Sequence, residues 1–358
     1  MSELENWIRL AKLESPRKAV ALVDHFGGPD DVFRAGIEDL AAAGDMPIKT
    51  AERFRAMASE PVDSEVEALE KVGARIVTYR DGEYPANLRQ IYDPPAVIFV
   101  RGELREEDRF AVGIVGTRRP TEYGKSMAFK ISRDLAQRGL TIVSGGARGV
   151  DTCAHTGAIQ GGRTIAILGS GIDVPYPYEN RGLLTKITEN GAVISEFVPG
   201  TKPDMWRFPV RNRLISGMSL GVLVVESGIK GGAMITASLA AEQGRDVWAL
   251  PGQTDSVASE GPHGLIKDGA KLVERAEDIL KDLGVEVETE SRARSTIPDN
   301  LTPDQKAIIG VLNLHPKHVD EIMAECKLTP AAASSALTLL EMQGLVRRVP
   351  GNSYVRAV

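Results

Sequence analysis

The chain has 358 residues, of which 42% are hydrophobic and 26% are charged, and this length favours two or three domains over one. The composition is ordinary for a soluble globular protein, and no apolar run is long enough to cross a bilayer, so we expect no membrane association. The formal net charge of -6, taken alone, argues against nucleic acid as a partner.

The N-terminal residues and the cysteines indicate a cytoplasmic location. The first ten residues carry acids where a signal peptide carries basic residues, and no small-residue cleavage site follows. Cys153 and Cys326 lie in segments that we assign to separate domains, which fits a reducing compartment better than a disulfide framework. No cluster of cysteine and histidine has metal-ligand spacing, and we expect neither a metal nor a cofactor.

Residues 1–70 are predicted to form a small helical domain, either SAM-like or helix-hairpin-helix-like. Leu4, Ile8 and Leu10 have helical spacing, and Pro16 suits the first turn of a second helix. Small helical units of this kind dock DNA backbone or protein partners. Because the segment has no basic cluster, both roles stay open.

Residues 71–283 are predicted to form an extended Rossmann-like domain with an α/β fold. Short apolar strands alternate with amphipathic stretches such as 123–138 and 233–243. Continuous apolar strands separated by helices indicate a doubly wound parallel sheet that is covered on both faces. The expected strands are Arg75–Tyr79, Val97–Val100, Ala111–Val115, Leu140–Val143, Thr164–Leu168, Ala192–Ile194, Gly221–Val225 and Val247–Leu250.

The C-terminal residues are predicted to form a linker and a winged helix. Residues 284–300 are polar and charged, with little to bury, as in a linker. Residues 301–358 show three helical stretches and then two short strands that flank Pro350-Gly351-Asn352. Three helices followed by a two-stranded hairpin are typical of a winged helix.

Positive charge is concentrated in the middle of the chain. Between Ile114 and Arg163, eight lysines and arginines stand against three acids, for a net of +5. Between Gly200 and Ile215, four stand against one. Some of these residues fit solvated helix faces. A local patch nevertheless matters more than the total charge for binding an anionic ligand.

Three glycine-rich loops each follow a predicted strand. The carboxyl ends of parallel strands meet at one edge of a sheet, where glycines let the backbone approach a phosphate. Each loop alone also fits tight strand-to-helix packing, but two loops carry arginine, which binds phosphate oxygens bidentately. We predict a phosphate-bearing ligand other than a dinucleotide, because the G-x-G-x-x-G pattern is missing from the first loop. The expected contacts are Gly116, Thr117, Arg118, Ser144, Gly145, Gly146, Arg148, Gly169, Ser170 and Gly171.

Two further segments extend this predicted site. In one, two arginines flank an asparagine just after aromatic residues, a combination that suits stacking on unpaired bases and contact with the backbone. In the other, a glycine-rich turn opens a helix after a strand. Trp206 is interpreted as a core residue. The expected contacts are Lys202, Phe208, Arg211, Asn212 and Arg213 in the first segment, and Lys230, Gly231 and Gly232 in the second.

In this order, the segments resemble the DNA-processing A (DprA/Smf) family. The stretches that carry the resemblance are IVGTRRPTEYG, IVSGGARGVDTCAH, TIAILGSGIDVPYP, ISEFVPG, FPVRNRLISGMS, VLVVESGIKGGAMITASLAAEQGRDVWALPG and GPHGLIKDGAKLV. Seven ordered motifs are far more specific than any one of them. Two departures occur: S-G-G-A stands for the usual S-G-L-A, and G-G-A stands for the usual S-G-S before the T-A helix.

The resemblance implies that the chain binds single-stranded DNA in a basic pocket of the Rossmann-like core. It implies a recombination mediator without catalysis, which loads the recombinase RecA during natural transformation. Single-strand-binding protein is a further expected partner. The resemblance also implies a homodimer, whose dimer and recombinase surface lies near 261–273 with His263, Leu265 and Ile266 as contacts.

Two other functions were weighed against this one. Rossmann-like nucleotide phosphoribohydrolases need a carboxylate that stabilises an oxocarbenium ion, but Ser238 stands where their glutamate would lie. Asp151 and His155 have i, i+4 spacing and are interpreted as structural. A winged-helix transcription regulator would need base-reading side chains, and the predicted recognition helix 330–343 has no lysine or arginine.

Overall fold

The computed structural model describes residues 3–13, 15–285, 301–313, 316–349 and 351–356. The chain divides into two compact units, one of Met1–Pro120 with Met127–Ile279 and one of Leu280–Val358 with Thr121–Ser126. Residues 286–300 of the predicted linker, Pro350 of the predicted turn in the winged helix, and Ala357, the last residue of the predicted strand 353–357, lie outside the described residues. The domain boundaries of the sequence analysis stay predictions.

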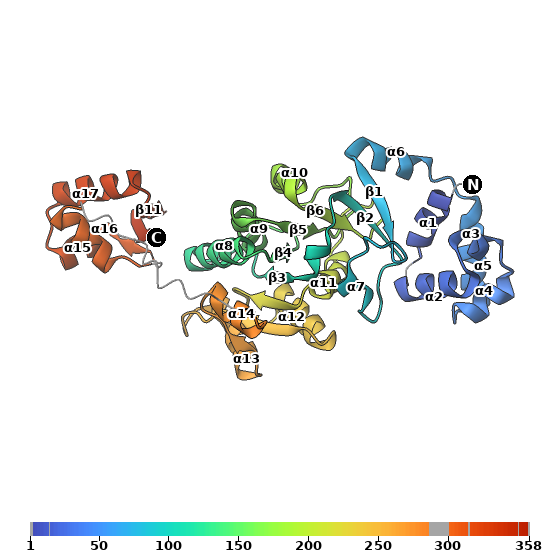
Figure 1. The fold of residues 1–358 in the computed structure, drawn as a ribbon. Coiled ribbons are helices and arrows are strands. Elements are labelled where there is room, and N and C mark those ends of the chain that lie inside the picture. The colour runs from blue at the N-terminus through green and yellow to red at the C-terminus, as the bar shows by residue number, and fades with distance from the viewer. Residues whose placement is uncertain (1–2, 14, 286–300, 314–315, 350, 357–358) are drawn as a thin grey trace. The chain divides into compact units, whose positions relative to one another are not determined.

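The first part of the larger unit is helical, as its sequence predicts. Pro16 and Pro29 each stand in the first turn of a helix, where their missing N–H has no role, and Gly27 ends one helix in the left-handed region. Ile8 and Phe54 are among the side chains buried at its centre. The helices are α1 (Glu3–Ala11), α2 (Pro16–Phe26), α3 (Pro29–Arg34), α4 (Ile37–Ala43), α5 (Ile48–Ala56) and α6 (Asp63–Val72) (Figure 1).

A nine-stranded sheet follows, in the order β1-β2-β6-β5-β4-β3-β7-β8-β9. β2 pairs antiparallel with both of its neighbours, β1 and β6, and all the other pairs of neighbouring strands are parallel. The eight predicted strands are confirmed to within two residues, whereas β9 was not predicted. The strands are β1 (Ala74–Thr78), β2 (Val97–Gly102), β3 (Ala111–Val115), β4 (Thr141–Ser144), β5 (Thr164–Ile167), β6 (Ala192–Ser195), β7 (Gly221–Val224), β8 (Asp246–Ala249) and β9 (Lys271–Leu272).

The chain runs outward from β3 through β4, β5 and β6, and then returns to place β7 on the other side of β3. The strand order therefore reverses beside β3, and open α/β sheets bind ligands at the carboxyl ends of strands at such a point. Helices cover both faces of the sheet, with α9 and α10 on one side and α11 and α12 on the other (Figure 1). The helices of this part are α7 (Ala86–Arg89), α8 (Glu122–Gln137), α9 (Val150–Gly161), α10 (Arg181–Asn190), α11 (Arg207–Met218), α12 (Gly232–Glu242), α13 (Glu260–Lys267) and α14 (Ala276–Asp282).

The C-terminal part folds as the predicted winged helix around its own apolar core. Thr302 and Gln305 form a capping box at the start of the first helix, and Ile308, Ile322 and Leu340 are fully buried. A short third strand, β10, was not predicted. The elements are α15 (Pro303–Val311), β10 (Lys317–His318), α16 (Val319–Cys326), α17 (Pro330–Met342), β11 (Val346–Val349) and β12 (Ser353–Arg356). Across the described parts of the chain, no helix has the length and apolar character that a membrane span requires.

Candidate functional site

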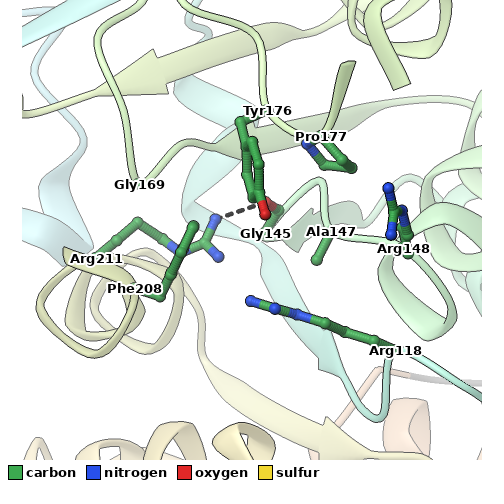
Figure 2. A pocket seen from close by; sticks show the side chains of 9 residues that line it. All are labelled: Arg118, Gly145, Ala147, Arg148, Gly169, Tyr176, Pro177, Phe208 and Arg211. Atoms are coloured by element: carbon green, nitrogen blue, oxygen red, sulfur yellow. Dashed lines mark hydrogen bonds between the residues drawn. The ribbon is translucent and has the colours of Figure 1, made fainter. Parts of the chain in front are cut away.

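A pocket lies where the loops after β3, β4 and β5 meet the first turn of α11 (Figure 2). Six of its nine lining residues belong to the predicted site, and three do not. Of the three, Ala147 lies within the second glycine loop, and Tyr176 and Pro177 follow the third. The aromatic Tyr176 in a loop after a strand is the signal that could have identified this part of the pocket. The lining consists of Arg118, Gly145, Ala147, Arg148, Gly169, Tyr176, Pro177, Phe208 and Arg211.

Arg211 lines the pocket although it is buried, with only 5% of its surface exposed. Its Nη1 donates to the carbonyl of Gly145 at 2.6 Å and to that of Ile167. A Cβ added at Gly145 would lie 2.5 Å from the guanidinium, so only glycine permits this close approach. Burial lowers the pKa of Arg211 to about 10, while Asp151 opposes this shift, and the side chain therefore stays charged at neutral pH.

Arg118 and two aromatic rings line the exposed part of the pocket. The guanidinium carbon of Arg118 lies 5.2 Å from the centre of the Phe208 ring. That ring lies 5.6 Å from the Tyr176 ring, with the two planes 33° apart. Figure 2 shows Arg118 and Arg211 reaching into the pocket from opposite sides, with their guanidinium groups toward each other. Such a pocket can hold a phosphate between cations and a flat ring against an aromatic face.

Arg148 lies at the rim and is exposed, and its guanidinium pairs with the exposed carboxylate of Glu179. Exposed pairs of this kind contribute little, because water and salt screen both charges. An anionic ligand can therefore replace Glu179 as the partner of Arg148 at small cost.

Several backbone amides that we expected to hold a phosphate already have partners. The amides of Gly145 and Ala147 both donate to Oδ2 of Asp151, each at 3.2 Å. The amides of Thr117 and Gly171 donate to the carbonyls of Glu226 and Thr201, at 2.7 and 2.9 Å, and that of Gly231 donates to the carbonyl of Gly228 at 2.9 Å. The positive character of the pocket therefore rests on its arginine side chains more than on these amides.

Arg213 is placed elsewhere, although it shares a sequence motif with Arg211. It is 6% exposed, and its guanidinium pairs with Glu196 and donates to the carbonyl of Asp93 at 2.8 Å. Burial raises the pKa of Glu196, and Arg213 counteracts this rise. The predicted site residues that do not line the pocket are Gly116, Thr117, Ser144, Gly146, Ser170, Gly171, Lys202, Asn212, Arg213, Lys230, Gly231 and Gly232.

Asp151 and His155 are buried and do not line the pocket. Nδ1 of His155 lies 2.8 Å from Oγ1 of Thr164, whose hydroxyl donates to the carbonyl of Ile142. The proton therefore sits on Nδ1 of a neutral imidazole. Burial, together with Arg211, lowers the pKa of His155 to about 3. Within the described ranges, no group of acidic, histidine and cysteine side chains is arranged to hold a metal ion.

The buried histidine predicts an acid-sensitive fold. The unfolded chain binds a proton at His155 near pH 6.5, whereas the folded chain resists protonation down to about pH 3. The stability is therefore complete above pH 6.5 and falls by up to about 1.4 kcal/mol for each pH unit below it. In urea unfolding, His155→Gln should lose about 2 kcal/mol less than the parent between pH 6.5 and pH 5. Equal losses would contradict this assignment.

The predicted dimer surface lies on α13. His263, Leu265 and Ile266 are all half-buried, and Leu265 packs against the core on one face of the sheet. Nε2 of His263 lies 3.2 Å from the backbone oxygen of Gly252. Leu272 of the edge strand β9, which lies within the predicted range 261–273, is 49% exposed, so an apolar side chain of this predicted surface faces water.

Comparison with known protein families identifies the family of this chain. The sequence model described as DNA recombination-mediator protein A matches residues 75–284, and the one described as DprA winged helix domain matches residues 292–352. The chain belongs to the DNA recombination-mediator protein A family. The resemblance drawn from the sequence motifs is thereby confirmed.

Curated relatives and solved structures of DprA and Smf proteins agree with this assignment. Protein Smf of Escherichia coli is 36% identical over 368 residues, which cover 99% of this chain and 96% of the relative. DprA of Bacillus subtilis is 42% identical over 218 residues, which cover 60% and 73%. The X-ray structure of DprA from Streptococcus pneumoniae has a TM-score of 0.68 at 32% identity and covers 79% of this chain and 98% of its own.

A second solved DprA structure also matches this chain. The structure of DprA from Helicobacter pylori has a TM-score of 0.53 at 31% identity, and the match covers 58% of this chain and 95% of that one. That protein is described as having a unique single-stranded DNA binding mode.

Proposed function

We propose that this DprA-family chain binds single-stranded DNA in the pocket and acts as a recombination mediator. The observation that carries the proposal is the meeting of three arginines and two aromatic rings in one pocket at the carboxyl edge of the sheet. Arg118, Arg148 and Arg211 bind phosphates, and Phe208 and Tyr176 stack on bases. The family assignment and the single-stranded DNA binding described for the Helicobacter pylori protein support this function.

The same chemistry favours unpaired DNA over duplex DNA. Bases in a duplex are stacked on one another, so their faces are not available to an aromatic side chain. An unpaired strand offers both a phosphate and a base face at each nucleotide, and every base has such a face. We therefore expect little sequence preference and a strong dependence on salt.

The partners and the location follow from a mediator role. We propose that the protein loads RecA onto the bound strand, in contact with single-strand-binding protein, during natural transformation in the cytoplasm. We also propose that it does so as a homodimer and without catalysis. Asp151 supports the last point, because this buried carboxylate already accepts two loop amides and does not line the pocket.

Competition between DNA forms tests the proposed function. A labelled oligothymidylate bound to the protein is challenged with unlabelled single strands and with a duplex of the same length. The single strand should displace the label at far lower concentration than the duplex. Equal competition by both forms would contradict the proposal, and so would release of free base from a nucleoside monophosphate.

The dimer is tested separately from the pocket. Ile266→Asp places a charge on α13, where an apolar contact is expected, and should convert the dimer to a monomer in light scattering. The affinity for a short oligothymidylate should change by less than about twofold, because Ile266 does not line the pocket. A dimer of unchanged mass in this variant would contradict the assigned surface.

A further inference from the structure

Trp206 lies outside the pocket, two residues before Phe208, and is 54% exposed. This corrects its interpretation as a core residue. The other two tryptophans of the chain, Trp7 and Trp248, are 6% and 0% exposed. The neighbouring Met205 is 86% exposed, so a sizeable apolar surface faces water beside the pocket.

The indole of Trp206 is held in place by its neighbours. The guanidinium carbon of Arg207 lies 4.5 Å from the Trp206 ring and 5.8 Å from the Phe197 ring. Phe197 meets Trp206 edge to face, with ring centres 6.5 Å apart and planes at 88°. Arg207 is fixed in turn, since it donates to the carbonyl of Lys202 at 2.9 Å and lies 3.9 Å from a carboxylate oxygen of Asp204.

We propose that Trp206, Arg207 and Phe197 form a second base-stacking site, the Trp206 platform, which binds the nucleotide next to those in the pocket. The inference rests on the proposed function and extends it. Trp206 is the N-cap residue of α11 and Phe208 lies in its first turn, so the proposed path takes the strand from the ring of Phe208 around the start of the helix to the indole of Trp206. A rigid indole that is held by a guanidinium is suited to stack on a base, and the exposed cation of Lys202 in the same segment can face a phosphate.

Charge favours a nucleic acid over an apolar protein segment as the occupant. Lys202 and Arg207 stand against the single acid Asp204 in this segment, and the pocket beside it contributes three arginines. Arg207 already balances Asp204, which leaves the charge of exposed Lys202 for a phosphate. A protein partner that binds here instead is one of the outcomes of the test.

The test combines binding affinity with tryptophan fluorescence. The full-length parent, Trp206→Ala and Trp206→Phe are titrated with oligothymidylates that increase in length from about 4 nucleotides. Tyr92→Ala is the matched control, because Tyr92 is also an exposed aromatic residue, at 75%, with a guanidinium 4.5 Å from its ring, and it lies outside the pocket. Thermal unfolding of each variant shows that the fold is kept.

The platform predicts a loss that depends on oligonucleotide length. Trp206→Ala should bind the longer strands about five- to thirtyfold more weakly than the parent, and Trp206→Phe should recover most of this loss. The shortest strand occupies only the pocket, so it should bind the parent and Trp206→Ala with equal affinity. Longer strands should quench the parent fluorescence but not that of Trp206→Phe, whose remaining tryptophans are buried, and Tyr92→Ala should behave as the parent.

The contrary outcomes separate this inference from the proposed function. If the shortest strand binds in an Arg118-dependent way while Trp206→Ala equals the parent at every length, the platform is wrong and the pocket stands. A Trp206→Ala variant that binds every strand normally but loses an interaction with RecA would show a protein contact and overturn the platform. If no strand binds the parent, the proposed function itself fails.

Discussion

Arg118→Ala should weaken the binding of oligothymidylate by about ten- to hundredfold at low salt, which corresponds to about 1.5–3 kcal/mol for a charge-assisted hydrogen bond. Arg118 is exposed and lines the pocket, so its loss removes a phosphate contact and leaves the core untouched. The difference between the variant and the parent should shrink as salt rises, because phosphate contacts are weakened by salt. Filter binding across a salt series measures both effects.

The chain offers a matched control in the next residue. Arg119 is also exposed but does not line the pocket, so Arg119→Ala makes the same change in net charge outside the predicted contact. It should lower the affinity by much less than Arg118→Ala. If the two variants lose the same affinity, the effect of Arg118 reflects overall charge, and its role in the pocket is refuted.

Arg211→Met should lower both stability and DNA binding. The substitution leaves the buried carbonyls of Gly145 and Ile167 without their donor and removes the positive charge that faces Asp151. We expect a loss of about 3 kcal/mol in the free energy of unfolding, together with a binding defect in the folded protein. Urea unfolding and oligothymidylate binding, measured on the same preparation, report the two effects.

Arg213→Met separates these two effects. Arg213 is buried to a similar degree as Arg211, but it pairs with Glu196 and contacts Asp93 away from the pocket. Its loss should destabilise the protein by a similar amount while the folded fraction keeps its affinity for DNA. Equal loss of affinity in both variants would show that the defect of Arg211→Met arises from instability alone.

The fold was predictable wherever a strand is buried on both faces. Ala111–Val115 is buried at every position, and such a strand must be a continuous apolar run, which the sequence shows directly. The edge strand Lys271–Leu272 has two exposed residues and no apolar run. Lys317–His318 is half-buried and also lacks an apolar run. Their pairing comes from neighbouring strands, so local sequence carries no signal for it.

The position of the candidate pocket was predictable from the sequence, but the contacts of its individual side chains were only partly predictable. Parallel strands bring their loops to one edge, which placed Arg118, Arg148 and Arg211 together in advance. The motif around Arg211 gave no reason to treat Arg213 differently. Two residues apart on a helix, the two side chains lie on opposite sides, and Arg213 pairs with Glu196, which comes directly after β6.

The glycine loops show a further limit of the sequence pattern. A glycine that allows a phosphate to approach and one that allows a side chain to approach look alike in sequence. At Gly145 the approaching group is the guanidinium of Arg211, and at Gly169 it is the ring of Phe208, 2.7 Å from an added Cβ. These two glycines therefore shape the pocket by admitting its own side chains.

Photo-crosslinking tests the central claim most directly, because it reports where the unpaired strand lies. An oligonucleotide that carries 5-iodouracil at successive positions is bound to the full-length protein, irradiated and mapped by mass spectrometry of the linked peptides. We expect crosslinks at Phe208 and Tyr176, and their loss in Arg118→Ala at a concentration that saturates the parent. Crosslinks confined to the winged helix or to the N-terminal helices would contradict the account.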